Sequence, residues 1–66
     1  MLDENELVEF RVVALHRAPL LVHALEVDGI EASFIESFER HMAPMTARVF
    51  VRRQDLARAL ADHGAD

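Results

Sequence analysis

The sequence contains no cysteine, tryptophan, tyrosine or lysine, and its 66 residues include only two glycines and two prolines. The absence of cysteine excludes disulfides and cysteine-ligated zinc, which commonly reinforce small domains. Reinforcement matters because a chain of this length buries only about 60% of the surface that its unfolded form exposes. Oligomerisation is the remaining common source of stability, so we expect this chain to associate.

The chain also lacks a basic face and a long apolar run. Its formal net charge is −5, and the part from Met1 to Glu36 holds eight acidic residues against two arginines. Nucleic-acid binding relies on basic residues that neutralise phosphates, so we expect no nucleic-acid partner. The longest apolar stretch, residues 18–22, is far shorter than the ~20 residues that cross a bilayer. The first ten residues are acidic where a secretory signal is basic and then apolar, which predicts a cytoplasmic protein with no membrane partner.

Catalytic motifs are missing as well. The sequence has no G-x-S-x-G motif, no glycine-rich phosphate loop and no cysteine nucleophile. Its four histidines, His16, His23, His41 and His63, do not show the H-x-x-x-H spacing that is typical of zinc ligands. We therefore expect no enzymatic activity, no catalytic residue, no cofactor and no metal.

In three segments the side chains alternate between two sides in the pattern that is typical of β-strands. In residues 6–15, one side would carry Val8, Phe10, Val12 and Ala14, and the other Leu7, Glu9, Arg11, Val13 and Leu15. Residues 30–35 and 47–51 are the second and third predicted strands, separated by a predicted loop over residues 37–46. Residues 1–5 are predicted to form a disordered tail.

Two segments have helical spacing. Pro19 predicts the start of a helix, because proline suits a first helical position, and Gly29 predicts its end in a left-handed conformation. Its apolar stripe is formed by Leu20, Leu21, Ala24, Leu25 and Val27. Residues 54–63 predict a second helix that ends at Gly64 and directs Leu56, Ala59 and Leu60 towards the core.

The order of these elements predicts one α+β domain over residues 1–66. A right-handed crossover from the first strand to the second leaves room for the third between them, which gives a mixed or antiparallel sheet with strand order 1-3-2. Both helices would cover one face, as in a ferredoxin-like βαββα fold without its fourth strand. The first strand would then keep an unpaired edge, which proteins usually cover or pair.

The unpaired edge of the first strand and the other sheet face together predict a homodimer, which could form through either of them. The predicted interface residues are Val13, Leu15, Ile35 and Phe50, together with Arg11. An apolar cluster on an open face commonly marks an interface, and the alternative is a monomer.

A ligand or protein partner has two candidate contact sets. Arg48, Arg52 and Arg53 lie where the third strand enters the last helix and could receive an anion; the alternative is that they pair with Glu9, Glu31 or Glu36. Phe38 and Met42 in the predicted loop could contact a partner, or fold back over the core.

The chain resembles a bacterial family of prokaryotic signal-transducing proteins. The resemblance rests on a proline-led helix that ends in Leu25, Glu26, Gly29 and Ile30, on Val49 and Val51 of a later strand, and on Asp55 and Ala59 of the helix that follows. It implies a ferredoxin-like fold related to PII regulatory proteins, and a regulatory role without catalytic residues. Two functions follow: a homodimeric regulatory module that binds a small ligand or a protein partner, or a plain protein-interaction subunit without a ligand.

Overall fold

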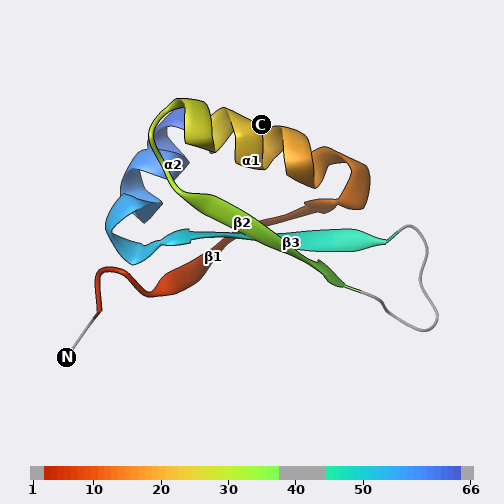
Figure 1. Cartoon of the computed structure of the whole chain (residues 1–66), viewed down its shortest axis with the longest axis horizontal. Coiled ribbons are helices and arrows are strands. Elements are labelled where there is room, and N and C mark those ends of the chain that lie inside the picture. Colours follow the sequence, from red (N-terminus) through yellow and green to blue (C-terminus); the bar gives the residue numbers. More distant parts are fainter. Residues whose placement is uncertain (1–2, 38–44, 65–66) are drawn as a thin grey trace.

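The computed structural model describes residues 3–37 and 45–64 (Figure 1). The elements are, in order, β1 (Leu7–Ala14), the 3-10 turn η1 (Leu15–Arg17), α1 (Ala18–Val27), β2 (Ala32–Ser37), β3 (Thr46–Arg52), the 3-10 turn η2 (Arg53–Asp55) and α2 (Leu56–His63). This order confirms the predicted βαββα arrangement. Within the described residues, no helix is long and apolar enough to cross a membrane.

The three strands form one antiparallel sheet in the order β1-β3-β2. The predicted strand order is therefore confirmed. Both helices lie on the same side of the sheet, as Figure 1 shows. This leaves the opposite side, which we call the open face, without a covering layer among the described residues.

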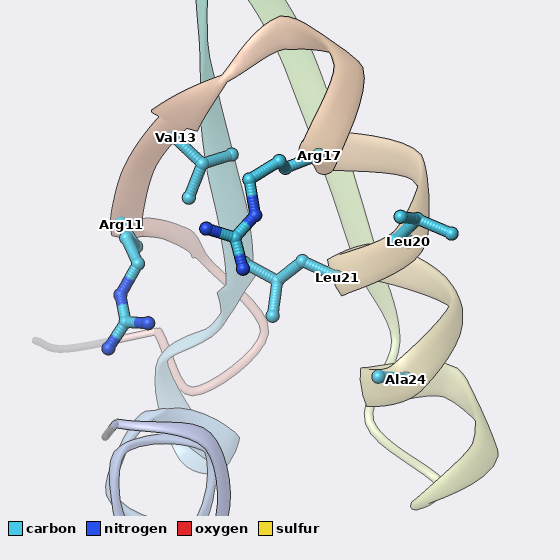
Figure 2. A pocket seen from close by; sticks show the side chains of 6 residues that line it. All are labelled: Arg11, Val13, Arg17, Leu20, Leu21 and Ala24. Carbon is cyan, nitrogen blue, oxygen red and sulfur yellow. The ribbon is translucent and has the colours of Figure 1, made fainter. Parts of the chain in front are cut away.

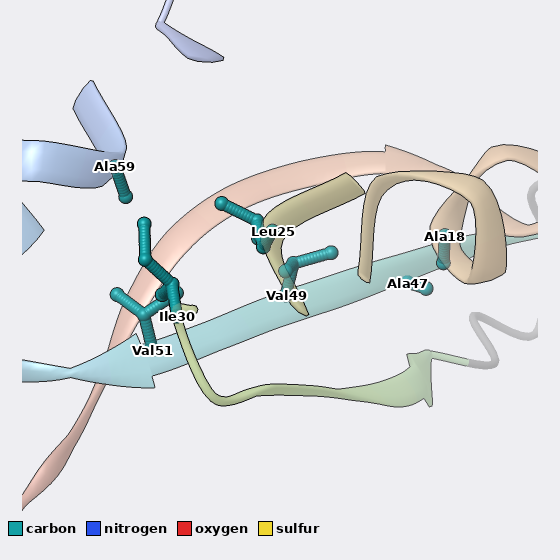
Figure 3. Packing of buried hydrophobic residues seen from close by; sticks show 7 residues of the cluster. All are labelled: Ala18, Leu25, Ile30, Ala47, Val49, Val51 and Ala59. Carbon is teal, nitrogen blue, oxygen red and sulfur yellow. The ribbon is translucent and has the colours of Figure 1, made fainter. Parts of the chain in front are cut away.

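The core lies between the sheet and the helices. Its fully buried members are Ala18 and Leu25 of α1, Ile30, the three inward residues of β3 and Ala59 of α2 (Figure 3). In β3 the buried residues are Ala47, Val49 and Val51, which alternate with more exposed neighbours as the sequence predicts. Fully apolar burial of this kind is the main source of stability in a small domain.

Local signals set the two ends of α1. Pro19 occupies the first turn, and no side chain caps the free N–H groups there. At the other end Gly29 has φ of 81° and donates its N–H to the carbonyl of Glu26 at 2.9 Å. The N–H of Ile30 then bonds to the carbonyl of Leu25 at 3.0 Å. These bonds are the left-handed helix ending that the sequence predicts, and they deliver Ile30 into the core just before β2 begins.

The apolar stripes of both helices are narrower than predicted. Leu20 and Val27 of α1 are each 71% exposed, and Leu60 of α2 is 50% exposed, so none of the three belongs to the core. Val22 of α1 packs against the core instead, and in α2 the core contacts come from Leu56 and Ala59. A helix that covers a narrow sheet buries only the side that faces it.

A β-bulge in β1 changes which residues face the helices. Glu9 pairs with Phe50 and Arg11 pairs with Val49, which leaves Phe10 without a partner in β3. A bulge inserts one extra residue, and every side chain beyond it moves to the opposite face. Val13 therefore pairs with Ala47, which is buried, and both Val13 and Leu15 pack against the core.

The predicted face of Arg11, Val13 and Leu15 was consequently wrong. All three follow the bulge and lie on the helix side, not on the open face. Val12 takes the place of Val13 on the open face, where it is 49% exposed. The predicted alternation holds only from Leu7 to Phe10.

The segment before β1 is bonded to the turn before α2. Arg53 donates its backbone N–H to the carbonyl of Glu6 at 2.8 Å, and Gln54 donates to the carbonyl of Glu4 at 3.1 Å. Asp3 accepts a further bond from the N–H of Glu6 at 3.0 Å. Of the segment predicted as a tail, residues 1–2 lie outside the described residues.

Candidate functional site

The open face is a strip of apolar and paired charged side chains. Residues that pair across a ladder point to the same side, so the register places Leu7, Glu9 and Val12 of β1, Arg48, Phe50 and Arg52 of β3, and Ser33 and Ile35 of β2 on this face. Leu7 is 53% exposed and Ile35 is 61% exposed. Of the predicted interface residues, Ile35 and Phe50 lie here.

The apolar residues of this face lie around Arg48. Arg48 pairs with Val12 on one side and with Ile35 on the other, and Phe50 is the next outward residue of β3. The Nε of Arg48 lies 3.5 Å from a carboxylate oxygen of Glu9. The cation is thus compensated within the chain, and its aliphatic stem continues the apolar strip between Val12 and Ile35.

The arginines predicted to receive a ligand each pair with a different carboxylate. Arg48 pairs with Glu9, Arg52 with Glu31, and Arg53 with Glu6 at 2.7 Å. The three arginine side chains are 38% to 59% exposed. Exposed ion pairs contribute only about 0–1 kcal/mol each to stability. The pairing with Glu9 and Glu31 is the alternative that the sequence left open. Phe38 and Met42 lie outside the described residues.

The edge of β1 away from β3 has no neighbouring strand among the described residues. The backbone N–H of Leu15 bonds to the carbonyl of Met45, and the carbonyl of Glu6 accepts from Arg53. Antiparallel strands alternate between residues that bond inward and residues that point away. Four residues of β1 therefore direct their backbone N–H and C=O groups away from β3, namely Leu7, Glu9, Val12 and Ala14.

A pocket of about 180 Å³ lies on the helix side, between β1 and α1 (Figure 2). Its lining comes from Arg11 and Val13 of β1, Arg17 of η1, and Leu20, Leu21 and Ala24 of α1. Sequence reasoning missed this pocket because the predicted alternation placed Arg11 and Val13 on the opposite face. Only the bulge brings them towards α1.

The contacts of Arg11 fix it beside the pocket. Its Nη2 donates a hydrogen bond to the carbonyl of Gly64 at 2.6 Å, at the end of α2. Its guanidinium also lies over the ring of Phe10, with its carbon 5.1 Å from the ring centroid. The bulge thus ties β1 to α2 through one arginine.

The end of α2 is also tied to the turn after α1. His63 and Asp28 are joined at 2.6 Å between Nε2 and Oδ2, and Arg58 donates to the carbonyl of Asp28 at 2.9 Å. Within residues 3–37 and 45–64, no three histidine, aspartate or glutamate side chains are grouped as metal ligands would be. His63 and Asp28 are therefore a pair between two elements.

No protein-family model matches this chain, and comparisons with curated proteins and with solved structures give no significant match. The resemblance to signal-transducing proteins accordingly stays a prediction that rests on the residues quoted for it.

Proposed function

We propose that this chain is a non-enzymatic regulatory module that acts as a homodimer, joined through the free edge of β1 and the open face beside it. The observation that carries the proposal is that β1 has an edge with no neighbouring strand among the described residues and carries the exposed apolar residues Leu7 and Val12. An exposed strand edge is a template for pairing with another chain. The surrounding apolar strip, with Ile35 and Phe50, extends the same surface.

The pattern of outward-facing backbone groups favours a second copy of this chain as the occupant. A two-fold axis requires that a strand pair with itself in the antiparallel sense. The bulge spaces the four outward residues so that they match under such an axis. Leu7 of one copy then lies opposite Ala14 of the other, and Glu9 lies opposite Val12, with the bulge at the centre.

This pairing would also add stability to a small chain that has no disulfides. Two copies would form a six-stranded antiparallel sheet whose open faces are continuous, and the edge of β1 would no longer be free. Stable interfaces bury about 800 Å² per partner, and edge pairing alone provides less than that. The apolar strip on the open face is therefore expected to contribute, either by lateral contact beside the axis or by packing against a second sheet.

Sedimentation equilibrium tests the dimer directly. We expect a mass about twice the 7.5 kDa of the chain at micromolar concentration. Val12→Glu should dissociate the dimer, because it places a carboxylate opposite Glu9 of the other copy. Val27→Glu is the matched control, since Val27 is a 71% exposed valine on α1, away from the proposed surface.

Cross-linking tests the register. The chain has no native cysteine, so Leu7→Cys and Ala14→Cys each introduce one thiol. Opposed residues in an antiparallel pair have Cα atoms about 5.5 Å apart, which suits a disulfide. A mixture of the two variants should form the mixed disulfide faster than either variant alone forms its own. A monomeric chain that keeps its full secondary structure would overturn the proposal, and a dimer unaffected by Val12→Glu would overturn the β1 surface.

A further inference from the structure

We propose that the pocket between β1 and α1 binds a small carboxylate that carries an apolar body. The pocket does not overlap the open face, because its lining residues lie on the helix side of the sheet. The inference names a ligand class for the regulatory module proposed above. It rests on that proposal for its regulatory consequence only.

The walls of the pocket suit an apolar body of limited size. Val13, Leu20, Leu21 and Ala24 contribute only aliphatic carbon, and none of the six lining residues is acidic. The volume of about 180 Å³ is slightly larger than the ~150 Å³ apolar cavity that accommodates one benzene ring. A single ring or a short branched chain fits this space.

Arg17 supplies the charge that selects an anion. Within the described part of the chain, the side chain of Arg17 makes no hydrogen bond or ion pair, although acidic residues outnumber arginines by twelve to seven. Arg48, Arg52 and Arg53 each have a carboxylate partner. Figure 2 shows the Arg17 side chain reaching from the start of α1 towards β1, across the apolar lining.

Arg11 adds a second positive charge on the strand side of the pocket. Its bond to Gly64 and its contact with the ring of Phe10 hold it in place. A guanidinium presents its N–H donors in a planar fork that matches both oxygens of a carboxylate. The apolar walls favour a ligand whose charge is confined to one end, so a carboxylate with a hydrocarbon body fits better than the strongly hydrated inorganic phosphate.

The position of the pocket links it to the dimer surface. Arg11 and Val13 line the pocket, while Val12 lies between them in sequence and faces the proposed interface. A ligand that packs against Val13 and the bulge would therefore fix the strand that forms the dimer edge. Binding is expected to favour the dimer if both proposals hold.

Titration followed by two-dimensional ¹⁵N–¹H NMR tests the pocket, with benzoate as the probe. The neutral benzamide and inorganic phosphate are the controls, at constant ionic strength because salt alone screens exposed charges. We expect benzoate to shift the amide signals of the lining residues in a saturable way. Benzamide should bind at least about 10-fold more weakly, as expected when a charge-assisted hydrogen bond is lost. Phosphate should cause no saturable shift.

Two variants and one matched control locate the site. Arg17→Gln should weaken benzoate binding about 10-fold or more, and Ala24→Leu should abolish it by filling the pocket while keeping a strong helix former. Arg58→Gln, which removes an arginine of α2 that lines neither the pocket nor the open face, should leave the affinity unchanged. Equal binding of benzoate and benzamide, or unaltered binding by Ala24→Leu with a dispersed spectrum, would overturn the pocket.

The outcome is separable from that of the dimer. The titration is repeated with Val12→Glu, which leaves all six lining residues in place. Benzoate binding by this variant supports the pocket whether or not the chain dimerises. If the wild-type chain does not bind benzoate but sediments as a dimer, the pocket proposal is overturned and the dimer proposal is retained.

Discussion

Replacing Ile30 with valine tests the packing of the core, and the same replacement at Ile35 provides a control of identical chemistry. Ile30 is 0% exposed and lies between the sheet and α2, close to Val51 and Ala59 (Figure 3). Ile35 is 61% exposed on the open face. Each substitution removes one methylene group, so any difference in free energy of unfolding comes from the surroundings of that group.

The expected magnitude follows from burial. Deleting a methylene from a packed core costs about 0.5–1.5 kcal/mol, and Ile30→Val should lie near the middle of this range because Ile30 is fully buried. The unfolding entropy is about 2.1 cal/mol/K per residue, which gives about 0.14 kcal/mol/K for 66 residues. A loss of about 1 kcal/mol then lowers Tm by about 7 °C. The total stability expected for this length is about 3–10 kcal/mol, so the variant remains folded.

Far-UV circular dichroism during thermal unfolding measures both variants. In dilute solution Ile35→Val should change Tm by much less than Ile30→Val, because its side chain stays largely in water in both states. At higher concentration Ile35→Val should lose stability relative to the wild type if the open face forms part of a dimer, since association stabilises the folded chain by mass action. Equal losses at the two sites in dilute solution would refute the assignment of Ile30 to the core.

Two further predictions concern local features. Gly29→Ala should lower the free energy of unfolding, measured in urea, by about 1–2 kcal/mol, because φ is 81° there and an L residue is strained in that conformation. The side-chain atom nearest to an added Cβ is 3.6 Å away, so no steric clash is expected. A loss far above this range would show such a clash and contradict the reasoning. Glu6→Gln should lower the free energy of unfolding by less than about 1 kcal/mol, because the ion pair of Glu6 with Arg53 is half exposed, and the loss should shrink as salt is added. A larger, salt-independent loss would show that the pair is not a surface interaction.

The fold was predictable because each element carries its own signal. The alternation of Ala47, Val49 and Val51 identified β3, and Gly29 identified the end of α1. The strand order then followed from the handedness of the crossover. These signals are local or topological, and none of them depends on a side chain finding one specific neighbour.

The bulge was not predictable from the residues of β1. Val12 and Val13 are identical neighbours, so the apolar pattern of this strand fits the sheet equally well with or without an extra residue. The register depends instead on pairing with β3 and on the closure of the segments at both ends, where Glu6 bonds to Arg53 and Leu15 bonds to Met45. Such long-range bonds leave no trace in a single sequence, and the predicted face of Val13 and Arg11 was wrong for this reason.

The residues of the candidate site were predicted only in part. Ile35 and Phe50 were placed on the open face correctly, because β2 and β3 alternate without interruption. The partners of Arg48, Arg52 and Arg53 could be named only as alternatives, since a pattern of charges does not fix which side chains meet. The pocket was missed altogether, because it requires Arg11 to face the same side as Leu21.

The bulge at Phe10 connects the two proposals physically. Without the extra residue, regular alternation would put Arg11 and Val13 on the open face and Val12 among the helices, and the pocket would lose both of its strand residues. The outward residues of β1 would then be Leu7, Glu9, Arg11 and Val13, so a two-fold pairing would set Glu9 opposite Arg11 instead of Val12. A bulge that lies beside both surfaces and is anchored to α2 through Arg11 is well placed to carry a change from the pocket to the edge. A coupling of this kind needs only that the ligand bind one arrangement of β1 better than another.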